Sequence, residues 1–203
     1  ELVKAILGIE HITEGTITYK GEKIVNKNFK EAIQRGFGLV PESRKEQGLV
    51  QLFSLKEIIC LVSMVKVILG GVIRNSKVKE YAGEYVKKLR IATPGIDTEV
   101  QYLSGGNQQK VVIAKWLTRD SDILIFDEPT RGIDVGAKNE IYKLMNKLAA
   151  EGKSIIMISS EMTEILRMSD RIVVMCEGKK TGEIGIAEAT QEKIMNLATR
   201  EID

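Results

Sequence analysis

The sequence is short of the residues that build disulfide scaffolds and metal clusters. It has two cysteines and one histidine among its 203 residues, too few for a disulfide framework or a histidine-based metal site. Cys60 and Cys176 lie far apart in apolar runs, as expected of reduced cysteines in the cytosol. We expect no signal peptide, and the apolar stretch 58–73 is interrupted by Lys66 and two glycines. These features speak against a secreted scaffold and a membrane-spanning helix.

A large excess of charge is also missing. The 30 basic and 28 acidic residues give a net charge of +2, so overall electrostatics does not predict nucleic-acid binding. With 43% hydrophobic and 29% charged residues, the composition is ordinary for a globular protein that can bury a sizeable core. We therefore expect one domain spanning residues 1–203.

The chain contains no Gly-x-x-x-x-Gly-Lys-[Ser/Thr] loop, the sequence that cradles phosphates in many nucleotide-binding proteins. It begins with Glu1 rather than methionine, and residues 1–7 resemble a helix that is already under way, with no capping residue before it. We therefore expect the chain to belong to a longer one.

Alternation of apolar and polar residues predicts an α/β core. Residues 16–25 are predicted to form an antiparallel hairpin. Beyond residue 108, apolar strands alternate with helices, a pattern typical of a mostly parallel sheet flanked by helices. The strands predicted for the core cover residues 37–40, 122–127, 154–159 and 171–176. We assign residues 1–49 and 96–203 to this core.

Residues 50–95 are predicted to form an all-helical subdomain. Ser54 and Glu57 form a capping box at the start of its first helix, and Ser76 is predicted to cap a second helix. The apolar face of the first helix is most simply interpreted as core; it consists of Leu61, Val62, Val65, Ile68 and Leu69.

Polar side chains follow three predicted strands at their carboxyl ends, where parallel sheets bind ligands. Glu42 follows the first, Asp127 and Glu128 close the second, and Ser160 follows the third. Asp127 can hold Mg²⁺ through water, while Glu128 can polarise an attacking water. Taken alone, the two acids are equally compatible with a simple turn that caps a helix.

A hydroxyl and two glycines, Ser104, Gly105 and Gly106, open another predicted helix. Helix N–H groups and the helix dipole favour an anion at such a position, and glycines allow its close approach. Taken alone, simple N-capping by Ser104 is the better explanation of the serine, and only its combination with Asp127 and Glu128 favours the anion-binding interpretation.

Four segments together resemble the ATP-binding cassette (ABC) ATPases over almost the whole chain. They are LSGGNQQK (103–110), DEPTRGID (127–134), PESRKEQGLV (41–50) and MSDRI (168–172). The asparagine after the glycines and the Pro-Glu-x-Arg-Lys run are most similar to the second, C-terminal nucleotide-binding domain of monosaccharide importers serving ribose, galactose or xylose. The resemblance implies a P-loop NTPase-like fold, truncated here after its Walker A loop, and the cofactors ATP and Mg²⁺.

The resemblance also implies a role for each candidate residue. Asp127 would support Mg²⁺, and Glu128 would be the catalytic base. The residues that would contact nucleotide bound by a partner cassette are Ser104, Gly105, Gly106, Asn107 and Gln108, with Asp134 in a loop (the D-loop) that crosses the interface.

Two positions depart from the general ABC pattern. Glu42 stands where a glutamine usually reaches the metal, and Ser160 stands where a histidine usually contacts the γ-phosphate. A carboxylate repels the nucleotide and a serine cannot carry positive charge, so we expect the hydrolysis at this domain's own site to be impaired. The neighbouring run Arg44-Lys45-Glu46 is predicted to be a solvated loop.

By the same resemblance, the partners would be the first nucleotide-binding domain of the same subunit, the membrane permease and, indirectly, a sugar-binding protein. The protein would lie at the cytoplasmic face of the membrane. Residues 52–55 and the Gly70-Gly71 break are candidates for permease contact. One alternative is an ABC-type ATPase without a permease, acting on nucleic acid or the ribosome, which the near-neutral charge disfavours. Another is a regulatory half-domain without nucleotide contact, which the intact acidic and Ser-Gly-Gly motifs disfavour.

Overall fold

The structure, a computed structural model, describes residues 1–12 and 14–199 and contains two compact units. The larger unit spans Leu2–Ile158, and the smaller one comprises the residues from Ser159 onward together with Glu1. Among the helices that the structure describes, none combines the length and apolar character needed to cross a bilayer.

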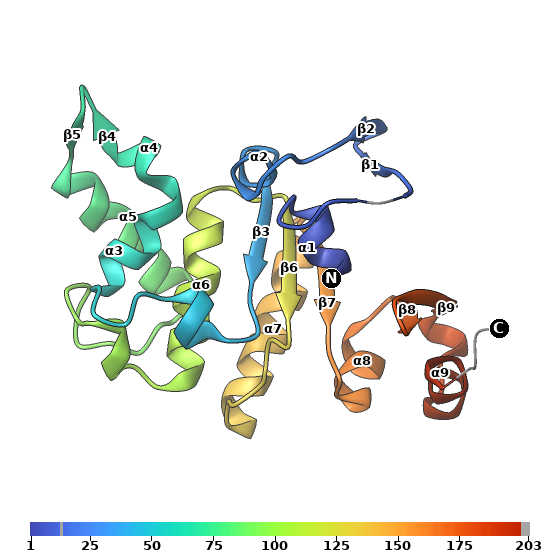
Figure 1. Cartoon of the computed structure of the whole chain (residues 1–203). Helices are drawn as coiled ribbons and strands as arrows, with labels where there is room; N and C mark the ends of the chain where they lie inside the picture. The colour runs from blue at the N-terminus through green and yellow to red at the C-terminus, as the bar shows by residue number, and fades with distance from the viewer. Residues whose placement is uncertain (13, 200–203) are drawn as a thin grey trace. The chain divides into compact units, whose positions relative to one another are not determined.

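A parallel sheet forms the centre of the larger unit (Figure 1). Its strands are β3 (Phe37–Val40), β6 (Ile123–Asp127) and β7 (Ser154–Ile158), arranged in the order β3-β6-β7. Val40 lies opposite Phe126, and β7 runs in register beside β6, so all three strands end at one edge. The predicted parallel sheet is confirmed for these three strands, and their ends meet as expected. The fourth strand predicted for this core, residues 171–176, is not part of this sheet; it belongs to the smaller unit, where its pairing is antiparallel.

Helices and a hairpin complete this part of the unit. The helices are α1 (Leu2–Ile6), α2 (Phe29–Gln34), α6 (Gly105–Thr118) and α7 (Val135–Ala150). The hairpin consists of β1 (Ile17–Tyr19) and β2 (Glu22–Ile24), which pair antiparallel as predicted. Helices α2 and α6 pack against β3, and α7 packs against β7. Apolar side chains fix these contacts, as in the buried cluster of Leu7, Ile24, Ala32, Phe37 and Ile125.

A mostly helical segment lies between β3 and α6. It contains α3 (Leu55–Cys60), α4 (Met64–Val67), β4 (Ile68–Leu69), β5 (Val72–Ile73) and α5 (Asn75–Lys88). The capping box at the start of α3 is confirmed, because Ser54 N–H donates to Glu57 Oε2 at 2.7 Å and the Ser54 side chain accepts from the Glu57 backbone.

The prediction that this segment is all-helical is wrong at residues 68–73. There β4 and β5 form a short antiparallel hairpin, with Leu69 opposite Val72 (Figure 1). Gly70 and Gly71 have φ values of +59° and +80°, and two consecutive positive φ values are what the tight turn of such a hairpin requires. Helix α5 then begins at Asn75, so Ser76 lies inside the helix instead of capping it.

The predicted core face of the insert is also wrong. The exposed fractions of Leu61, Val65 and Leu69 are 40%, 71% and 59%. Helix α3 ends at Cys60 and a 3-10 turn follows, so the helical period on which that face depends is interrupted. Between residues 55 and 73, the buried apolar residues are instead Leu55, Ile58, Ile59, Cys60 and Val67.

The smaller unit has its own apolar cluster. Its elements are α8 (Met162–Met168), β8 (Arg171–Cys176), β9 (Lys179–Gly185) and α9 (Gln191–Ala198). Strands β8 and β9 pair antiparallel, and Ile172 and Val174 of β8 cluster with Ile194 of α9. The Thr190 side chain accepts a hydrogen bond from Lys193 N at 3.2 Å, which confirms that Thr190 opens the last helix.

Candidate functional site

Two adjacent carboxylates stand at the end of the central strand. Asp127 is the last residue of β6, and Glu128 N–H donates to Ile158 O at 2.9 Å. Glu128 has φ +46°, a left-handed conformation that is uncommon outside glycine and that collects at functional sites. Burial, and then the neighbouring charge of Glu128, raise the pKa of Asp127. The strand end therefore holds negative charge in surroundings that disfavour it.

Such a strand end suits a cation with few protein ligands. Across residues 1–12 and 14–199, no group of three or more His, Cys, Asp or Glu side chains could enclose a metal ion. Mg²⁺ commonly binds through one or two carboxylates, with waters and substrate phosphates completing its shell. Asp127 and Glu128 fit this kind of site, in which the ion would relieve the unfavourable charge.

Ser104 directly precedes α6 but does not act as its side-chain cap. Its Oγ accepts a hydrogen bond from Asn107 Nδ2 at 2.9 Å, and Asn107 Oδ1 accepts from Ala92 N–H at 2.8 Å. Within the described chain, Ser104 makes no side-chain hydrogen bond to the N–H groups of the helix. Simple capping therefore does not explain this serine. Its hydroxyl hydrogen can donate to an acceptor in front of α6, beside helix N–H groups that lack intrahelical partners.

Packing within the chain accounts for both glycines at the start of α6. A Cβ atom on Gly105 would lie 2.8 Å from Arg44 Nη2, and one on Gly106 would lie 2.7 Å from Ala137 Cβ. Both distances are too short for real contacts: a larger residue at Gly105 would displace the end of the Arg44 side chain, and one at Gly106 would have to push α6 away from α7. The glycines allow α6 to approach Arg44 and α7 closely, whatever they also do for a ligand.

Two further predicted site residues are engaged in the chain's own structure. Gln108 is 2% exposed; its Nε2 donates to Val100 O at 3.0 Å and its Oε1 accepts from Arg44 Nε at 3.3 Å. Asp134 caps α7, because its Oδ1 accepts from Ala137 N–H at 2.9 Å. In this arrangement both side chains position the segments that carry the other site residues.

Arg44 is not part of a solvated loop, contrary to the prediction for residues 44–46. The segment Arg44–Gly48 forms one π-helical turn, in which Lys45 and Glu46 are exposed but Arg44 is half-buried. Arg44 Nη1 donates to Arg131 O at 3.1 Å, and Nη2 donates to the next carbonyl, Gly132 O, at 3.2 Å. Burial lowers the pKa of the Arg44 guanidinium. The arginine thus joins the segment after β3 to the loop after β6.

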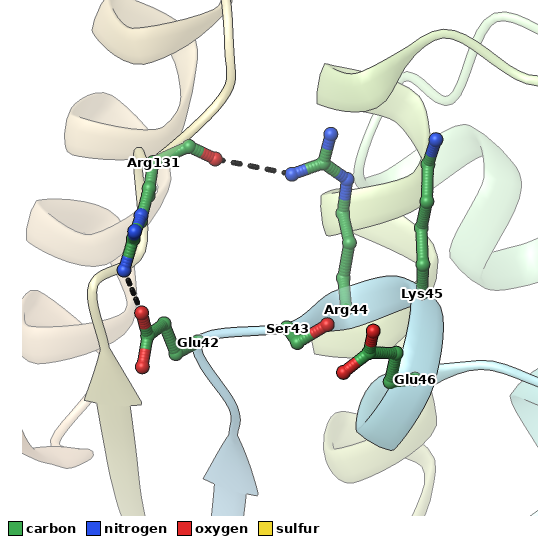
Figure 2. Close-up of a pocket in the computed structure, with 6 residues that line it drawn as sticks. All are labelled: Glu42, Ser43, Arg44, Lys45, Glu46 and Arg131. Carbon is green, nitrogen blue, oxygen red and sulfur yellow. Dashed lines mark hydrogen bonds and ion pairs between the residues drawn. The ribbon is translucent and has the colours of Figure 1, made fainter.

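Glu42 is paired with a basic residue. Its carboxylate forms an ion pair with the Arg131 guanidinium, while the main-chain carbonyl of Arg131 accepts from Arg44 (Figure 2). Together with Ser43, Lys45 and Glu46, these three residues line a pocket of about 340 Å³. Arg131 therefore offsets the negative charge on which the expected repulsion between Glu42 and a nucleotide depends.

Ser160 belongs to the smaller unit, although it follows β7 by only two positions in the chain. Its neighbour Ser159 donates to Glu164 and accepts from Glu161 N–H at 3.0 Å, so this stretch is ordered by contacts within that unit. The assignment of Ser160 to the site continues to rest on the sequence.

Sequence reasoning missed Arg44 and Arg131 as site residues. Both lie in segments that carried the resemblance, Pro-Glu-x-Arg-Lys and Asp-Glu-Pro-Thr-Arg-Gly. The Pro-Glu-x-Arg-Lys run could have indicated Arg44, because it was one of the more specific elements of the resemblance. Without the resemblance, a charged run is most simply interpreted as a solvated loop. Two of the partners of the Arg44 side chain are backbone carbonyls, which leave no trace in a sequence.

Comparisons with known proteins agree on one family. A family model described as ABC transporter matches residues 1–131. A putative ribose/galactose/methyl galactoside import ATP-binding protein of Burkholderia ambifaria is 50% identical over 201 residues. The ribose import ATP-binding protein RbsA of Bacillus subtilis is 48% identical over 199 residues. Both alignments cover 98% of this chain but 39% and 40% of the relatives, so the chain spans about two fifths of their length.

Solved structures show the same fold. A nucleotide-free ATP-binding cassette from an ABC transporter matches 98% of this chain and 79% of its own, with a TM-score of 0.79 and 20% identity. A dimeric cassette in a post-hydrolysis state, bound to ADP and Pi, matches 91% of this chain and 79% of its own, with a TM-score of 0.74 and 22% identity. The predicted fold class is confirmed.

Proposed function

Since the chain belongs to the ABC transporter family, we propose that it is an ATPase domain that powers the import of a simple sugar. We further propose that it lends its signature segment, Ser104 to Gln108, to the ATP site of a partner cassette. The observation that carries this proposal is the start of α6, where the Ser104 hydroxyl accepts from Asn107 and is directed away from capping the helix. The relatives are named as sugar-import proteins, and these names suggest the direction of transport and the class of substrate.

The start of α6 fits a phosphate group in several ways. The helix is 14 residues long, so its first N–H groups carry the positive end of a substantial dipole. Asn107 fixes the orientation of Ser104, and Gln108 holds the helix against the segment after β3. In the proposed role, Ser104 O–H and the N–H groups of Gly105 and Gly106 donate to the γ-phosphate of the partner's ATP.

Asp127 and Glu128 are proposed to serve the nucleotide on this domain's own side. Mg²⁺, when bound, would supply charge neutralisation for the phosphates and for these two carboxylates. Asp127 would hold the ion, and Glu128, fixed by its N–H bond to Ile158 O, would accept a proton from water. Glu42 and Ser160 are proposed to be weak substitutes for the usual glutamine and histidine, so hydrolysis at this side would be slow.

The proposed assembly needs further protein components. We propose that the chain is the second nucleotide-binding domain of a two-cassette subunit, with residues 1–203 as one domain and 50–95 as its helical subdomain. Its partners would be the first cassette, a membrane permease and, indirectly, a sugar-binding protein, at the cytoplasmic face of the membrane. Leu52 and Phe53, 72% and 38% exposed, are candidates for permease contact, whereas Leu55 is fully buried and serves the core. The exposed Gly70-Gly71 turn is a second candidate.

The ATPase activity of the isolated chain tests this assignment. The chain has no Walker A motif, so alone it should hydrolyse ATP only at the background rate. The measurement is phosphate release by the purified chain with and without Mg²⁺. Clear Mg²⁺-dependent turnover that Glu128→Gln abolishes would show that the chain has a complete site of its own.

A further inference from the structure

Two segments of the larger unit are tied together crosswise by two arginines. From the segment after β3, the Arg44 side chain donates hydrogen bonds to two main-chain carbonyls of the loop after β6, Arg131 O and Gly132 O. From the loop after β6, the Arg131 side chain forms an ion pair with Glu42 in the segment after β3. Figure 2 shows Arg131 held at both ends, by Arg44 at its carbonyl and by Glu42 at its guanidinium.

We propose that Arg44 and Arg131 form a reciprocal clamp that fixes the 131–134 loop and the start of α6, with Glu42 as the anchor for Arg131. In this proposal, the two arginines and Glu42 are positioning residues. They prepare the surface that, under the proposed function, meets the partner cassette.

The Arg44 half of the clamp depends on the shape of guanidinium. Its nitrogen atoms reach two successive carbonyls and the Gln108 amide oxygen, at 3.1, 3.2 and 3.3 Å. A planar fork of donors can hold three acceptors at once, whereas a lysine ammonium at the same place cannot match that geometry. The bond to Gln108 is partly buried, so it faces less competition from water than a surface contact does.

The clamp acts on both segments of the proposed interface. Gly132 O, one acceptor of Arg44, lies 3.3 Å from where a Cβ on Gly105 would be, so loop and helix meet there. The same loop ends at Asp134, which caps α7. Holding residues 131 and 132 therefore fixes the approach to Asp134 and the space in front of Ser104 together.

The clamp also gives Glu42 a role that a glutamine could not fill. A carboxylate makes an ion pair with a guanidinium, whereas an uncharged amide oxygen accepts only a weaker hydrogen bond from it. Both side chains remain largely exposed, at 66% for Arg131 and 46% for Glu42, so the pair adds little to global stability. We expect the pair to limit the local motion of the 131–134 loop, which a measurement of the free energy of global unfolding does not detect.

Amide hydrogen exchange on the full chain tests the clamp without any nucleotide. In peptides covering residues 129–136, Arg44→Lys should speed exchange by about 10-fold, since hydrogen bonds to a charged group are lost. Glu42→Gln and Arg131→Gln should each speed it by about 3-fold, the size expected of an exposed ion pair. Lys45→Gln and Glu46→Gln, which change neighbouring charges of the same pocket, should leave exchange in this region unchanged.

A charge swap separates the clamp from a general loss of packing. In the double variant Glu42→Arg with Arg131→Glu, the opposite charges face each other again, so exchange should return close to the wild-type rate. The matched single variants are Glu42→Arg and Arg131→Glu. If the double variant exchanges no more slowly than these single variants, or if Lys45→Gln speeds exchange in the loop as much as Arg44→Lys does, the clamp is refuted.

A second arm rests on the proposed function and uses the whole protein with its permease. Arg44→Lys should lower kcat for ATP about 10-fold with little change in KM, because the partner's nucleotide still binds while the donated segment is misplaced. A loosened loop with unchanged kcat would refute the catalytic consequence of the clamp and leave the exchange result standing. An unchanged loop would refute the clamp itself, whatever the proposed function.

Discussion

Asp127 and Glu128 concentrate strain and unfavourable charge at a single strand end. Glu128 adopts φ +46°, and burial together with Glu128 raises the pKa of Asp127. A fold optimised only for stability would place neither feature there. The two residues were recognisable from their motif, but their conformation was not, because the left-handed turn depends on the hydrogen bond to Ile158 O on the neighbouring strand.

Replacing Asp127 should stabilise the chain at neutral pH. Its pKa is higher in the fold than in the unfolded chain, so the ionised form costs stability at neutral pH. That cost disappears as pH falls through the raised pKa towards the ordinary value of 3.8. Asp127→Asn should therefore raise the free energy of unfolding by about 1 kcal/mol at pH 7, with no gain near pH 3. Urea titrations across this pH range measure the difference.

Asp97 provides the matched control, because its pKa is shifted in the opposite direction. The hydrogen bond and charge of Lys56 hold the pKa of Asp97 below its usual value. Asp97→Asn should slightly destabilise the chain at pH 7, and the loss should fade as pH falls through the lowered pKa. A destabilised Asp127→Asn chain at neutral pH would contradict the account of this site.

Lys115 is a buried cation that bonds to a backbone carbonyl. It is 6% exposed, its Nζ donates to Gly48 O at 2.7 Å, and burial lowers its pKa to about 8. The unfolded chain holds this proton up to about pH 10.5, so stability should rise between about pH 8 and 10.5, by at most about 3 kcal/mol. Lys115→Met should lack this rise. Equal pH slopes for wild type and Lys115→Met would show that Lys115 keeps its charge in the fold.

At the scale of elements, the sequence was most informative where the pattern was local. The capping box of α3, the cap of α9 and the strands β3, β6 and β7 followed from residue spacing and are confirmed. The insert was mispredicted because a 3-10 turn and the Gly70-Gly71 hairpin break the helical period there. Close contacts between elements, such as that of α6 with α7 at Gly106, were beyond prediction because they depend on which distant segments meet.

The contact of α6 with α7 makes a prediction about glycines. Gly106→Ala would place a methyl group 2.7 Å from Ala137 Cβ, so we expect a loss of about 1–3 kcal/mol in unfolding free energy. Gly83 lies inside α5, where an added Cβ meets nothing within 4 Å, so Gly83→Ala should stabilise by up to about 1 kcal/mol. Chemical denaturation of both variants measures the difference. A neutral Gly106→Ala would show that α6 and α7 can separate freely.

At the scale of the whole molecule, two separate features of the larger unit carry the proposed function. At the edge where β3, β6 and β7 end, Glu42 follows β3, and Asp127 and Glu128 lie at the end of the neighbouring strand β6. The start of α6 presents Ser104 with an orientation set by Asn107. Under the proposed function, the nucleotide sites shared with a partner cassette would use both features. The two curated relatives are about two and a half times as long as this chain.

The most direct test of the central proposal is sugar uptake by the whole protein with its permease, comparing two variants. Ser104→Arg places a bulky cation in front of α6 and should abolish uptake, because the partner cassette's ATP can no longer dock there. Glu128→Gln removes only the proposed base on this domain's own side and should reduce uptake much less. If the two variants transport equally well, or if Glu128→Gln is the more damaging, this chain does not serve chiefly as the donor of a signature segment.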